Sequence, residues 1–280
     1  MVVRSLLTQF IDGISIPYFS NSNKGAFHSF QIRKRDNLHK ASLRSKENLP
    51  PPFGFSLPVV KYLYNDKMRC AMSKCIIFCA AEFDRLLEPI AEGDFLIAAD
   101  GGLRHVHTLG LVPDAVLGDF DSLGFIPEGS RVYPVEKDDT DAMLAIRLGL
   151  EKGYGSFLIY GGLDGPRLDH TVANFQALQY LADRGASGYL AGRDHLVTVV
   201  KDGSISFPPE ARGTVSLFCL GPDARGVTLE GLYYPLEDWT LTSGFPLGVS
   251  NHFTGTPARI TVREGSLLVL WNRETGLPGR

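Results

Sequence analysis

Short apolar segments alternate with amphipathic segments between residues 75 and about 191. The expected strands are Cys75–Ala81, Phe95–Ala99, Ala115–Leu117, Arg131–Val135, Phe157–Tyr160 and Gly188–Leu190. The expected helices are Asp84–Glu92, Leu103–Leu109, Thr140–Lys152 and Asp169–Arg184. Strands that alternate with helices in this way predict a largely parallel sheet that is covered by helices on both faces.

From about residue 192 the helical periodicity disappears, and short apolar runs are separated by Gly, Pro and Asp. The expected strands here are His195–Val200, Val215–Leu220, Val227–Leu229, Trp239–Thr242, Ala258–Val262 and Ser266–Trp271. Evenly spaced short strands with turn signals predict an antiparallel sandwich or barrel. We therefore predict an α/β fold, with a largely parallel α/β/α domain at residues 73–191 and a C-terminal antiparallel β-sandwich domain at residues 192–280.

Residues 1–72 show no sustained hydrophobic period, and we predict a poorly ordered or loosely attached extension. They hold eleven Lys and Arg against four Asp and Glu, a charge of +7, which leaves −10 on the remainder of a chain whose total is −3. Three interpretations stay open: a targeting segment, a binding arm, or the product of an upstream start codon with translation normally beginning at Met72. We favour the last. Because neither a helical face nor an aromatic platform organises the basic residues, we expect no nucleic-acid partner.

The chain of 280 residues has ordinary globular composition, with 44% hydrophobic and 21% charged residues. It contains no apolar run of the roughly 18 residues that a bilayer span needs, and we expect no secretory signal at its N-terminus. We therefore expect no membrane partner and a cytoplasmic location. The four cysteines lack CxxC spacing and are expected to be buried free thiols: Cys70, Cys75, Cys79 and Cys219.

Charged residues follow four of the expected strands where each strand ends. They are Asp100, then Asp119 and Asp121, then Asp138, Asp139 and Asp141, and finally Arg167 and Asp169. The carboxyl ends of parallel strands lie along one edge of a sheet, and ligands bind there. Several carboxylates in one crevice repel each other, and a hard divalent cation resolves that conflict. The pattern therefore predicts a site for Mg²⁺ and a polyphosphate, provided that a bend at the strand end turns Asp119 and Asp121 to one side.

A glycine-rich segment, Gly161–His170, follows the strand Phe157–Tyr160. Glycines after a strand let the backbone approach phosphate, and the N-terminus of the next helix attracts anions. Arg167 is suited to paired contacts with phosphate oxygens, or to a salt bridge with a surface acid. His170 at a helix start is more typical of a structural residue than of a catalytic base.

Each acidic element also has a purely structural interpretation. Asp100 with the two following glycines is a common turn, and Asp138 or Asp139 suits the cap of a helix that starts at Thr140. Four such elements at four successive strand ends favour a functional site.

The chain resembles the thiamine pyrophosphokinase family from about Lys74 to Trp271. The resemblance lies in four motifs with the same order and spacing: Ala99-Asp100-Gly101-Gly102, Gly118-Asp119-Phe120-Asp121-Ser122, Lys137-Asp138-Asp139-Thr140-Asp141 and the loop Gly161–His170. It implies an α/β catalytic domain, a C-terminal β-sandwich that binds thiamine, and a homodimer with thiamine at the subunit interface. Residues 1–72 fall outside the resemblance. Pro166 departs from it, since relatives often have glycine at that position.

The resemblance also implies roles for individual residues. The implied Mg²⁺ ligands are Asp119, Asp121 and Asp141, and the implied catalytic set adds Asp100 and Arg167. The implied contacts to ATP or diphosphate are Asp139, Gly161, Gly162, Arg167, Asp169 and His170. Ser250 and Asn251 are similar to the family's thiamine-binding segment, which the partner subunit supplies. Trp271 is expected either to stack on thiamine or to be a core aromatic residue of the last strand.

The reaction that the resemblance implies is the transfer of diphosphate from ATP to the thiamine hydroxyl, giving thiamine diphosphate and AMP. Two alternatives use the same acids or the same pocket. One is a Mg-dependent nucleotide phosphohydrolase, in which water replaces thiamine. The other is a non-catalytic sensor that binds nucleotide or thiamine without turnover. A glycosyltransferase with an Asp-x-Asp motif is a weaker alternative.

Overall fold

The computed structural model describes residues 7–11, 14–18, 73–121, 123–134 and 138–278. The chain divides into two compact units, residues 1–56 and residues 57–280, and each is described by itself. In the first unit β1 (Leu7–Ile11) pairs antiparallel with β2 (Ile14–Tyr18). The sequence did not predict this hairpin. The rest of residues 1–72, with Cys70 and the expected poor order, lies outside the described residues.

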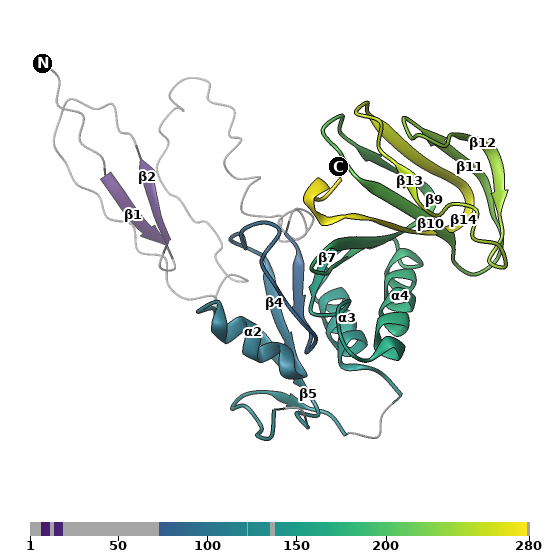
Figure 1. Ribbon diagram of the computed structural model, residues 1–280. Coiled ribbons are helices and arrows are strands. Elements are labelled where there is room, and N and C mark those ends of the chain that lie inside the picture. Colours follow the sequence, from purple (N-terminus) through teal and green to yellow (C-terminus); the bar gives the residue numbers. More distant parts are fainter. Residues whose placement is uncertain (1–6, 12–13, 19–72, 122, 135–137, 279–280) are drawn as a thin grey trace, which may run out of the picture. The chain divides into compact units, whose positions relative to one another are not determined.

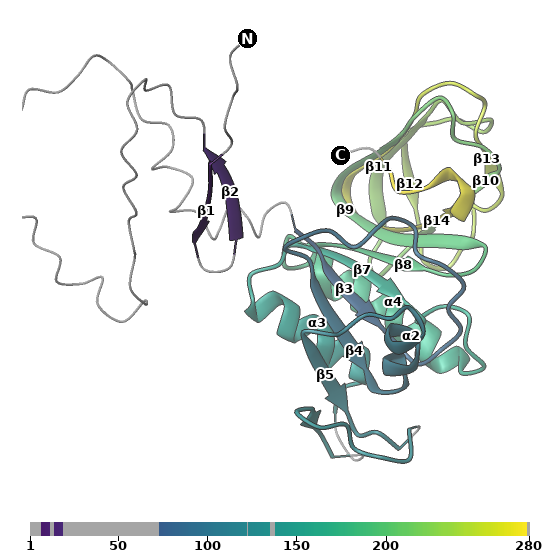
Figure 2. The ribbon, with the colours of Figure 1, turned by 90° about the vertical axis from the view of Figure 1, so that its left-hand side faces the viewer.

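The second unit is built on a run of parallel strands. They are β3 (Cys75–Phe78), β4 (Phe95–Ala99), β5 (Ala115–Gly118), β6 (Arg131–Val132), β7 (Ser156–Tyr160) and β8 (Ser187–Ala191). Their order across the sheet is β8-β7-β3-β4-β5-β6, and all neighbours in this run are parallel. Figure 2 shows β5, β4, β3, β7 and β8 following one another across the unit.

Helices cover both faces of the parallel strands. Along β3, Ile76 and Phe78 point to the face that carries α2 (Leu103–Thr108), whereas Cys75 and Ile77 point to the face that carries α3 (Asp141–Glu151) and α4 (Leu168–Ala182). Figure 1 shows α3 and α4 together on one side of the strands and α2 on the other. Burial on both faces explains why these strands are almost continuously apolar. Among the described residues, every helix is too short or too polar to cross a membrane.

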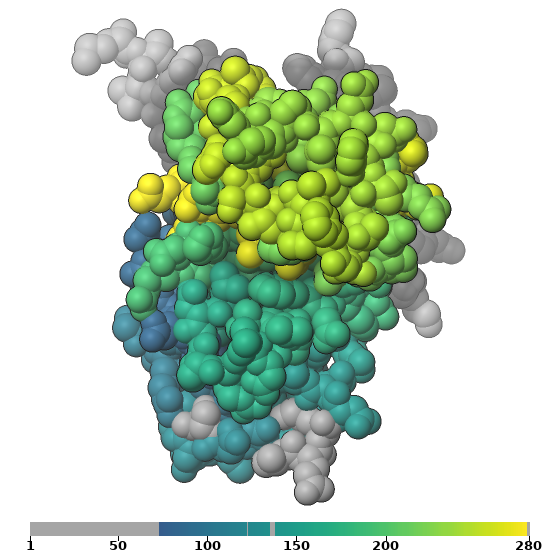
Figure 3. Space-filling view, turned by 45° about the vertical axis from the view of Figure 1, so that its right-hand side comes forward, coloured from purple at the N-terminus to yellow at the C-terminus, as the bar shows by residue number. Residues whose placement is uncertain are grey.

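Antiparallel strands continue the same sheet. They are β9 (His195–Phe207), β10 (Thr214–Cys219), β11 (Ala224–Glu230), β12 (Leu236–Leu241), β13 (Asn251–His252) and β14 (Ala258–Asn272). Strand β9 pairs with β8 on one edge and with β14 on the other. The interior of these strands joins the core on the α2 face, and Figure 3 shows the green and yellow C-terminal part in direct contact with the teal part. The predicted class, a parallel α/β core plus antiparallel strands, is confirmed, while the division at residue 192 stays a prediction.

Strand β14 replaces two expected strands, Ala258–Val262 and Ser266–Trp271. An irregularity between Val262 and Ser266 interrupts its register with β9, as a β-bulge does. The first part of β14 pairs with β11 and the second part pairs with β10, while β9 borders both parts. One bent strand therefore serves two neighbours on the same edge.

The helix expected at Asp84–Glu92 is wrong, because the segment is irregular. Two of its backbone groups bond to side chains from distant parts of the chain. The Tyr160 hydroxyl accepts from the backbone N–H of Leu87 at 3.0 Å, and the Arg273 guanidinium donates to the carbonyl of Arg85. Strand β6 is shorter than expected, and the last residue of the expected range, Val135, lies outside the described residues.

Candidate active site

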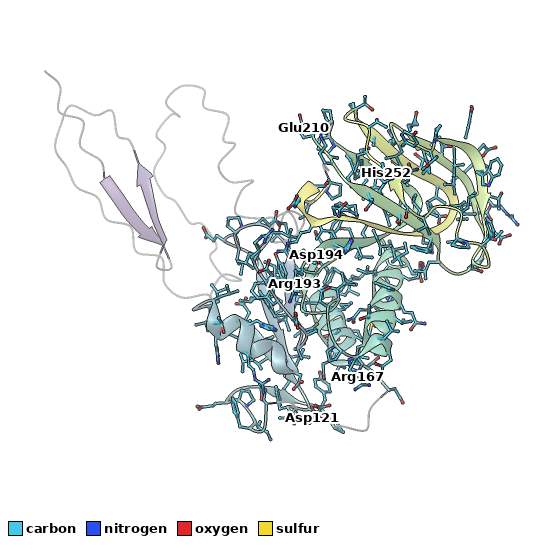
Figure 4. The ribbon with its side chains drawn as sticks, in the orientation of Figure 1. Asp121, Arg167, Arg193, Asp194, Glu210 and His252 are labelled. Atoms are coloured by element: carbon cyan, nitrogen blue, oxygen red, sulfur yellow. The ribbon has the colours of Figure 1, made fainter. Side chains whose placement is uncertain are left out.

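A pocket of about 640 Å³ lies at the carboxyl edge of the parallel strands. The parallel register brings the last residues of β3, β4, β5 and β7 to the same edge, so the residues that follow them meet there. The pocket is lined by most of the predicted site residues: Asp100, Asp119, Asp121, Asp139, Asp141, Gly161, Gly162, Arg167 and His170. Figure 4 shows Asp121 and Arg167 at the same end of the α/β part. The fold therefore gathers these acids in one crevice.

Asp100 occupies the first position of a single 3-10 turn, η3 (Asp100–Gly102), directly after β4. Its φ of 46° lies in the left-handed region, which residues other than glycine rarely adopt. Gly118 makes room for this turn, since a Cβ atom there would lie 3.0 Å from the Cα of Asp100. The Asp100 side chain is buried against the pocket. Strained conformations of this kind cluster at functional sites.

The segment after β5 carries Asp119 and Asp121 to the pocket. The sequence-based expectation that these two acids need a bend between them is wrong, because side chains two positions apart in an extended chain already point to the same side. Phe120 between them has a φ of 61°, and the backbone N–H of Asp121 donates to Oδ1 of Asp119 at 3.3 Å. Both acids line the pocket.

Carboxylate oxygens of Asp100, Asp119 and Asp121 all lie within 4.8 Å of one another. Three oxygen donors this close together fit Mg²⁺, which binds through a few carboxylates and keeps positions for water and phosphate. This group includes Asp100 and does not include Asp141, which the resemblance implies as the third metal ligand. Asp141 lines the same pocket from the first residue of α3.

Thr140 is the N-cap of α3, and its Oγ1 accepts from the backbone N–H of Met143 at 3.2 Å. The interpretation of Asp138 or Asp139 as this cap is therefore wrong. Thr140 has the extended backbone that the cap position requires, directly before the first helical residue. The Asp139 carboxylate lines the pocket instead, with its Oδ2 3.0 Å from Nη1 of Arg147.

The glycine-rich loop packs tightly behind the pocket. Gly161 has a φ of 64°, and a Cβ atom there would lie 2.4 Å from the carbonyl oxygen of Cys79. The Asn174 Nδ2 donates to the carbonyl of Gly162 at 2.7 Å, and the Thr171 Oγ1 donates to the carbonyl of Leu163 at 3.2 Å. Side chains of α4 thus hold the loop in a fixed position at the pocket wall.

Arg167 precedes the first residue of α4 and contacts Asp169 through two donors. Its Nε lies 2.9 Å from Oδ1, and its Nη2 lies 2.6 Å from Oδ2. The hydrogen bond from Arg167 lowers the pKa of Asp169 to about 2, and the same contact raises the pKa of Arg167. Arg167 lines the pocket, whereas Asp169 lies outside its lining. The Asp169 carboxylate therefore orients the Arg167 guanidinium, which is available to bind a phosphate in the pocket.

The residues expected to bind thiamine lie outside this pocket. Ser250 is exposed with a φ of 59°, and the buried Asn251 accepts from the N–H of Tyr234 and donates to its carbonyl, at 2.9 and 2.8 Å. In Figure 4 the next residue, His252, lies in the antiparallel strands, away from Asp121 and Arg167. Trp271 is 1% exposed, and its Nε1 donates to the carbonyl of Gly276 at 3.0 Å. Of the two interpretations of Trp271, this placement matches the core aromatic residue, because neither face of its ring is open to a ligand.

Four residues of the site escaped the sequence analysis: Thr171, Asn174, Arg147 and Cys79. The first two carried a weak signal, because they fall one and two turns into a helix that begins at the glycine-rich loop. Arg147 carried none, since its position on α3 matches an ordinary exposed residue. Cys79 lines the pocket, and burial, with a smaller contribution from Asp141, raises the pKa of its thiol to about 12.

Comparison with protein families gives two matches along the chain. The family described as "Thiamin pyrophosphokinase, catalytic domain" matches residues 87–190. The family described as "Thiamin pyrophosphokinase, vitamin B1 binding domain" matches residues 203–267. The two matches follow one another without overlap, and the pocket residues Asp100 to Asn174 fall within the first.

Individual relatives agree with this result. The thiamine pyrophosphokinase of Bacillus subtilis (strain 168) is 28% identical over 186 residues, which span 62% of this chain and 85% of that protein. The crystal structure of the Bacillus subtilis thiamine pyrophosphokinase superposes with a TM-score of 0.60 at 26% identity, covering 71% of this chain and 97% of that one. A thiamin pyrophosphokinase family protein from Enterococcus faecalis gives a TM-score of 0.60 at 25% identity, covering 71% and 98%.

Proposed function

This chain belongs to the thiamine pyrophosphokinase family, and on that premise we propose that it transfers diphosphate from ATP to the hydroxyl of thiamine, yielding thiamine diphosphate and AMP. The observation that carries the proposal is the pocket itself, in which five aspartates and Arg167 meet at the carboxyl edge of the parallel strands. A triphosphate needs both a cation site and a fixed guanidinium, and the pocket offers both. The chemistry, the family and the fold point to the same reaction.

We propose Mg²⁺ as the cofactor, held by Asp119, Asp121 and Asp141, with the Asp100 carboxylate beside them. Support for this assignment is the cluster of carboxylate oxygens, whose hard donors match the preference of that ion. When bound, Mg²⁺ supplies positive charge that offsets the charge of the triphosphate. The same acids also favour thiamine, which is a cation.

The chain's own residues have separate tasks in the proposed mechanism. Arg167 binds phosphate oxygens through donors that Asp169 holds in position, and the backbone of Gly161 and Gly162 gives the phosphates room to approach. The thiamine hydroxyl oxygen bonds to the β-phosphorus, and the bond from that phosphorus to the oxygen of AMP breaks. AMP leaves with the electron pair. Asp100, buried at the pocket wall, accepts the hydroxyl proton.

We propose that thiamine binds where a second copy of the chain places Ser250 and Asn251 beside the pocket. Asn251 holds the backbone of Tyr234, and Tyr233, Tyr234 and Leu247 are exposed apolar side chains of the same region. Exposed aromatic groups of this kind favour an interface and can contact the thiamine rings. A homodimer would then contain complete sites, with residues 73–191 as the catalytic domain and residues 192–280 as the thiamine-binding domain. A cytoplasmic location fits the free thiols of Cys75, Cys79 and Cys219.

Incubation of the purified protein with ATP, Mg²⁺ and thiamine tests the proposal. Mass spectrometry should find thiamine diphosphate and AMP in equal amounts. A nucleotide phosphohydrolase would release AMP at the same rate without thiamine, and a sensor would bind both ligands and release nothing. Either result would overturn the proposed transferase.

A further inference from the structure

Asp139 lines the pocket and forms a salt bridge with an arginine that lies outside the lining. Among the described residues, it is the one acid of the lining with such a contact. Its Oδ2 lies 3.0 Å from Nη1 of Arg147, which is on α3 two turns after the helix start. The Asp139 side chain is 22% exposed and the Arg147 side chain is 48% exposed. The ion pair thus connects the wall of the pocket with the outer surface of α3.

Arg147 is in turn held from the neighbouring helix. Its guanidinium carbon lies 5.9 Å from the centre of the Tyr180 ring, and Tyr180 is on α4. A second arginine, Arg184, lies 3.3 Å from the centre of the same ring, and its Nη1 donates to the carbonyl of Tyr180. A cation within about 6 Å of an aromatic face is attracted to it, and Arg147 lies near the limit of that range. The Arg147 guanidinium is therefore attracted both by the Asp139 carboxylate and by the Tyr180 ring.

The charges of the pocket give this contact a consequence. Among the described residues, five aspartates line the pocket with a single arginine, Arg167, and that arginine already contacts Asp169. ATP is strongly anionic, so each carboxylate without a counter-charge opposes its entry. Arg147 adds a positive charge next to the wall, through its contact with Asp139, without entering the pocket.

We propose that Arg147 is a positioning residue that fixes the Asp139 carboxylate and offsets its charge, and so favours binding of the metal–ATP complex. The inference rests on the proposed function for its ligand. It predicts an effect on nucleotide binding, because thiamine is a cation and gains nothing from an added positive charge. If the salt bridge only stabilised α3, its removal would lower the melting temperature and change the KM values for the two substrates equally.

Three single variants separate these cases. Arg147→Met removes the charge and keeps much of the side-chain length, and it should raise the KM for ATP roughly fivefold or more while changing the KM for thiamine less than twofold. Arg147→Lys keeps the charge and loses the planar guanidinium, so it should raise the KM for ATP less than Arg147→Met does. Arg184→Met is the matched control, since it removes an arginine from the same Tyr180 ring but not from Asp139. It should leave both KM values unchanged.

A binding measurement makes the test independent of turnover. The probe is α,β-methylene ATP with Mg²⁺, in which the bond that the reaction breaks is replaced, and calorimetry gives its Kd. Arg147→Met should weaken this Kd by the same factor as the KM for ATP. If the wild type forms no thiamine diphosphate but Arg147→Met still weakens binding of the probe, the proposed function fails and the role of Arg147 stands.

A double variant tests whether Arg147 acts through Asp139. In an Asp139→Asn background no carboxylate is left to position, so Arg147→Met should change the Kd of the probe less than twofold. An effect as large as in the wild-type background would overturn the inference. Equal Kd values for Arg147→Met and Arg184→Met in the otherwise wild-type protein would overturn it as well.

Discussion

The Arg167 guanidinium and the Asp169 carboxylate lie side by side at the start of α4, joined by an Nη2–Oδ2 contact of 2.6 Å and an Nε–Oδ1 contact of 2.9 Å. Only the arginine lines the pocket. The Asp169 carboxylate, outside the pocket lining, therefore orients the Arg167 guanidinium, which is part of the lining. An oriented guanidinium costs less entropy when it binds phosphate, since its rotamer is already chosen.

Asp169→Asn should weaken this orientation. The amide can accept from one donor of Arg167 but offers an NH₂ group where the second oxygen stood, so the paired contact is lost. We expect the KM for ATP to rise by about three- to tenfold, with a smaller change in the KM for thiamine. Steady-state kinetics with each substrate varied in turn measure both. Asp183→Asn is the control, because Asp183 is ion-paired with Lys201 at the other end of α4. Unchanged ATP kinetics in Asp169→Asn would rule out an orienting role.

The same contact predicts a pH dependence. The pKa of Asp169 is lowered from 3.8 to about 2 by its hydrogen bond from Arg167. A carboxyl group with a lowered folded pKa stabilises the fold above its unfolded pKa, and this contribution is lost as the pH falls from about 4 through about 2. Carboxyl-carbon NMR should therefore show Asp169 titrating near pH 2, and Arg167→Met should return the midpoint toward 3.8. A wild-type midpoint near 4 would contradict the paired contact.

The sequence predicted the meeting of the acids in one pocket better than it predicted several elements. The order of strands and acids was sufficient to place Asp100, Asp119 and Asp121 at one edge, because parallel strands align their carboxyl ends regardless of the exact strand bounds. The pattern of apolar residues located β4 (Phe95–Ala99) to the residue. Such patterns do not show which backbone groups form hydrogen bonds with side chains from distant parts of the sequence. The irregular segment after Phe83 depends on Tyr160 and Arg273, which are far away in the sequence.

The ion pair between Asp139 and Arg147 escaped the sequence analysis for the same reason. The residues around Arg147 do not distinguish it from other exposed helix residues, and its contact with Asp139 depends on how the segment before α3 folds back toward the helix. Trp271 illustrates the limit for aromatic residues, since core packing and ligand stacking require the same side chain. Its burial against Phe207 and Tyr189 could be learned only from the folded strands.

Asp121→Asn should abolish turnover while the fold stays intact. Asp121 contributes one of the clustered carboxylate oxygens and is exposed in the pocket, so the amide removes a charged metal donor without creating a cavity. We expect a loss of about a hundredfold or more in kcat/KM at moderate Mg²⁺ concentration. Unfolding curves that match the wild type verify the fold, and Glu210→Gln, a surface acid outside the pocket lining, is the control. Normal activity of this variant at saturating Mg²⁺ would show that Asp121 is not a metal ligand.

Asn251→Ala should raise the KM for thiamine more than the KM for ATP. It should also lower the melting temperature, because the Asn251 side chain bonds to both backbone groups of Tyr234 and is 3% exposed. Loss of these buried bonds costs about 1–3 kcal/mol of stability. Kinetics well below the melting temperature separate the two effects. Equal changes in both KM values would mean that Asn251 supports the fold and makes no difference to thiamine binding.

Cys79 should resist alkylation in the folded protein even though it lines the pocket. Burial, and to a smaller extent the negative charge of Asp141, raises the pKa of its thiol to about 12, and only the thiolate reacts with iodoacetamide. At pH 8 we expect slower labelling of Cys79 than of the less buried Cys219, and labelling of both after denaturation. Mass spectrometry of peptides measures the two rates. Because burial is the larger cause, Asp141→Asn should leave Cys79 protected, and rapid labelling of Cys79 in that variant would show that charge, not burial, suppresses the thiolate.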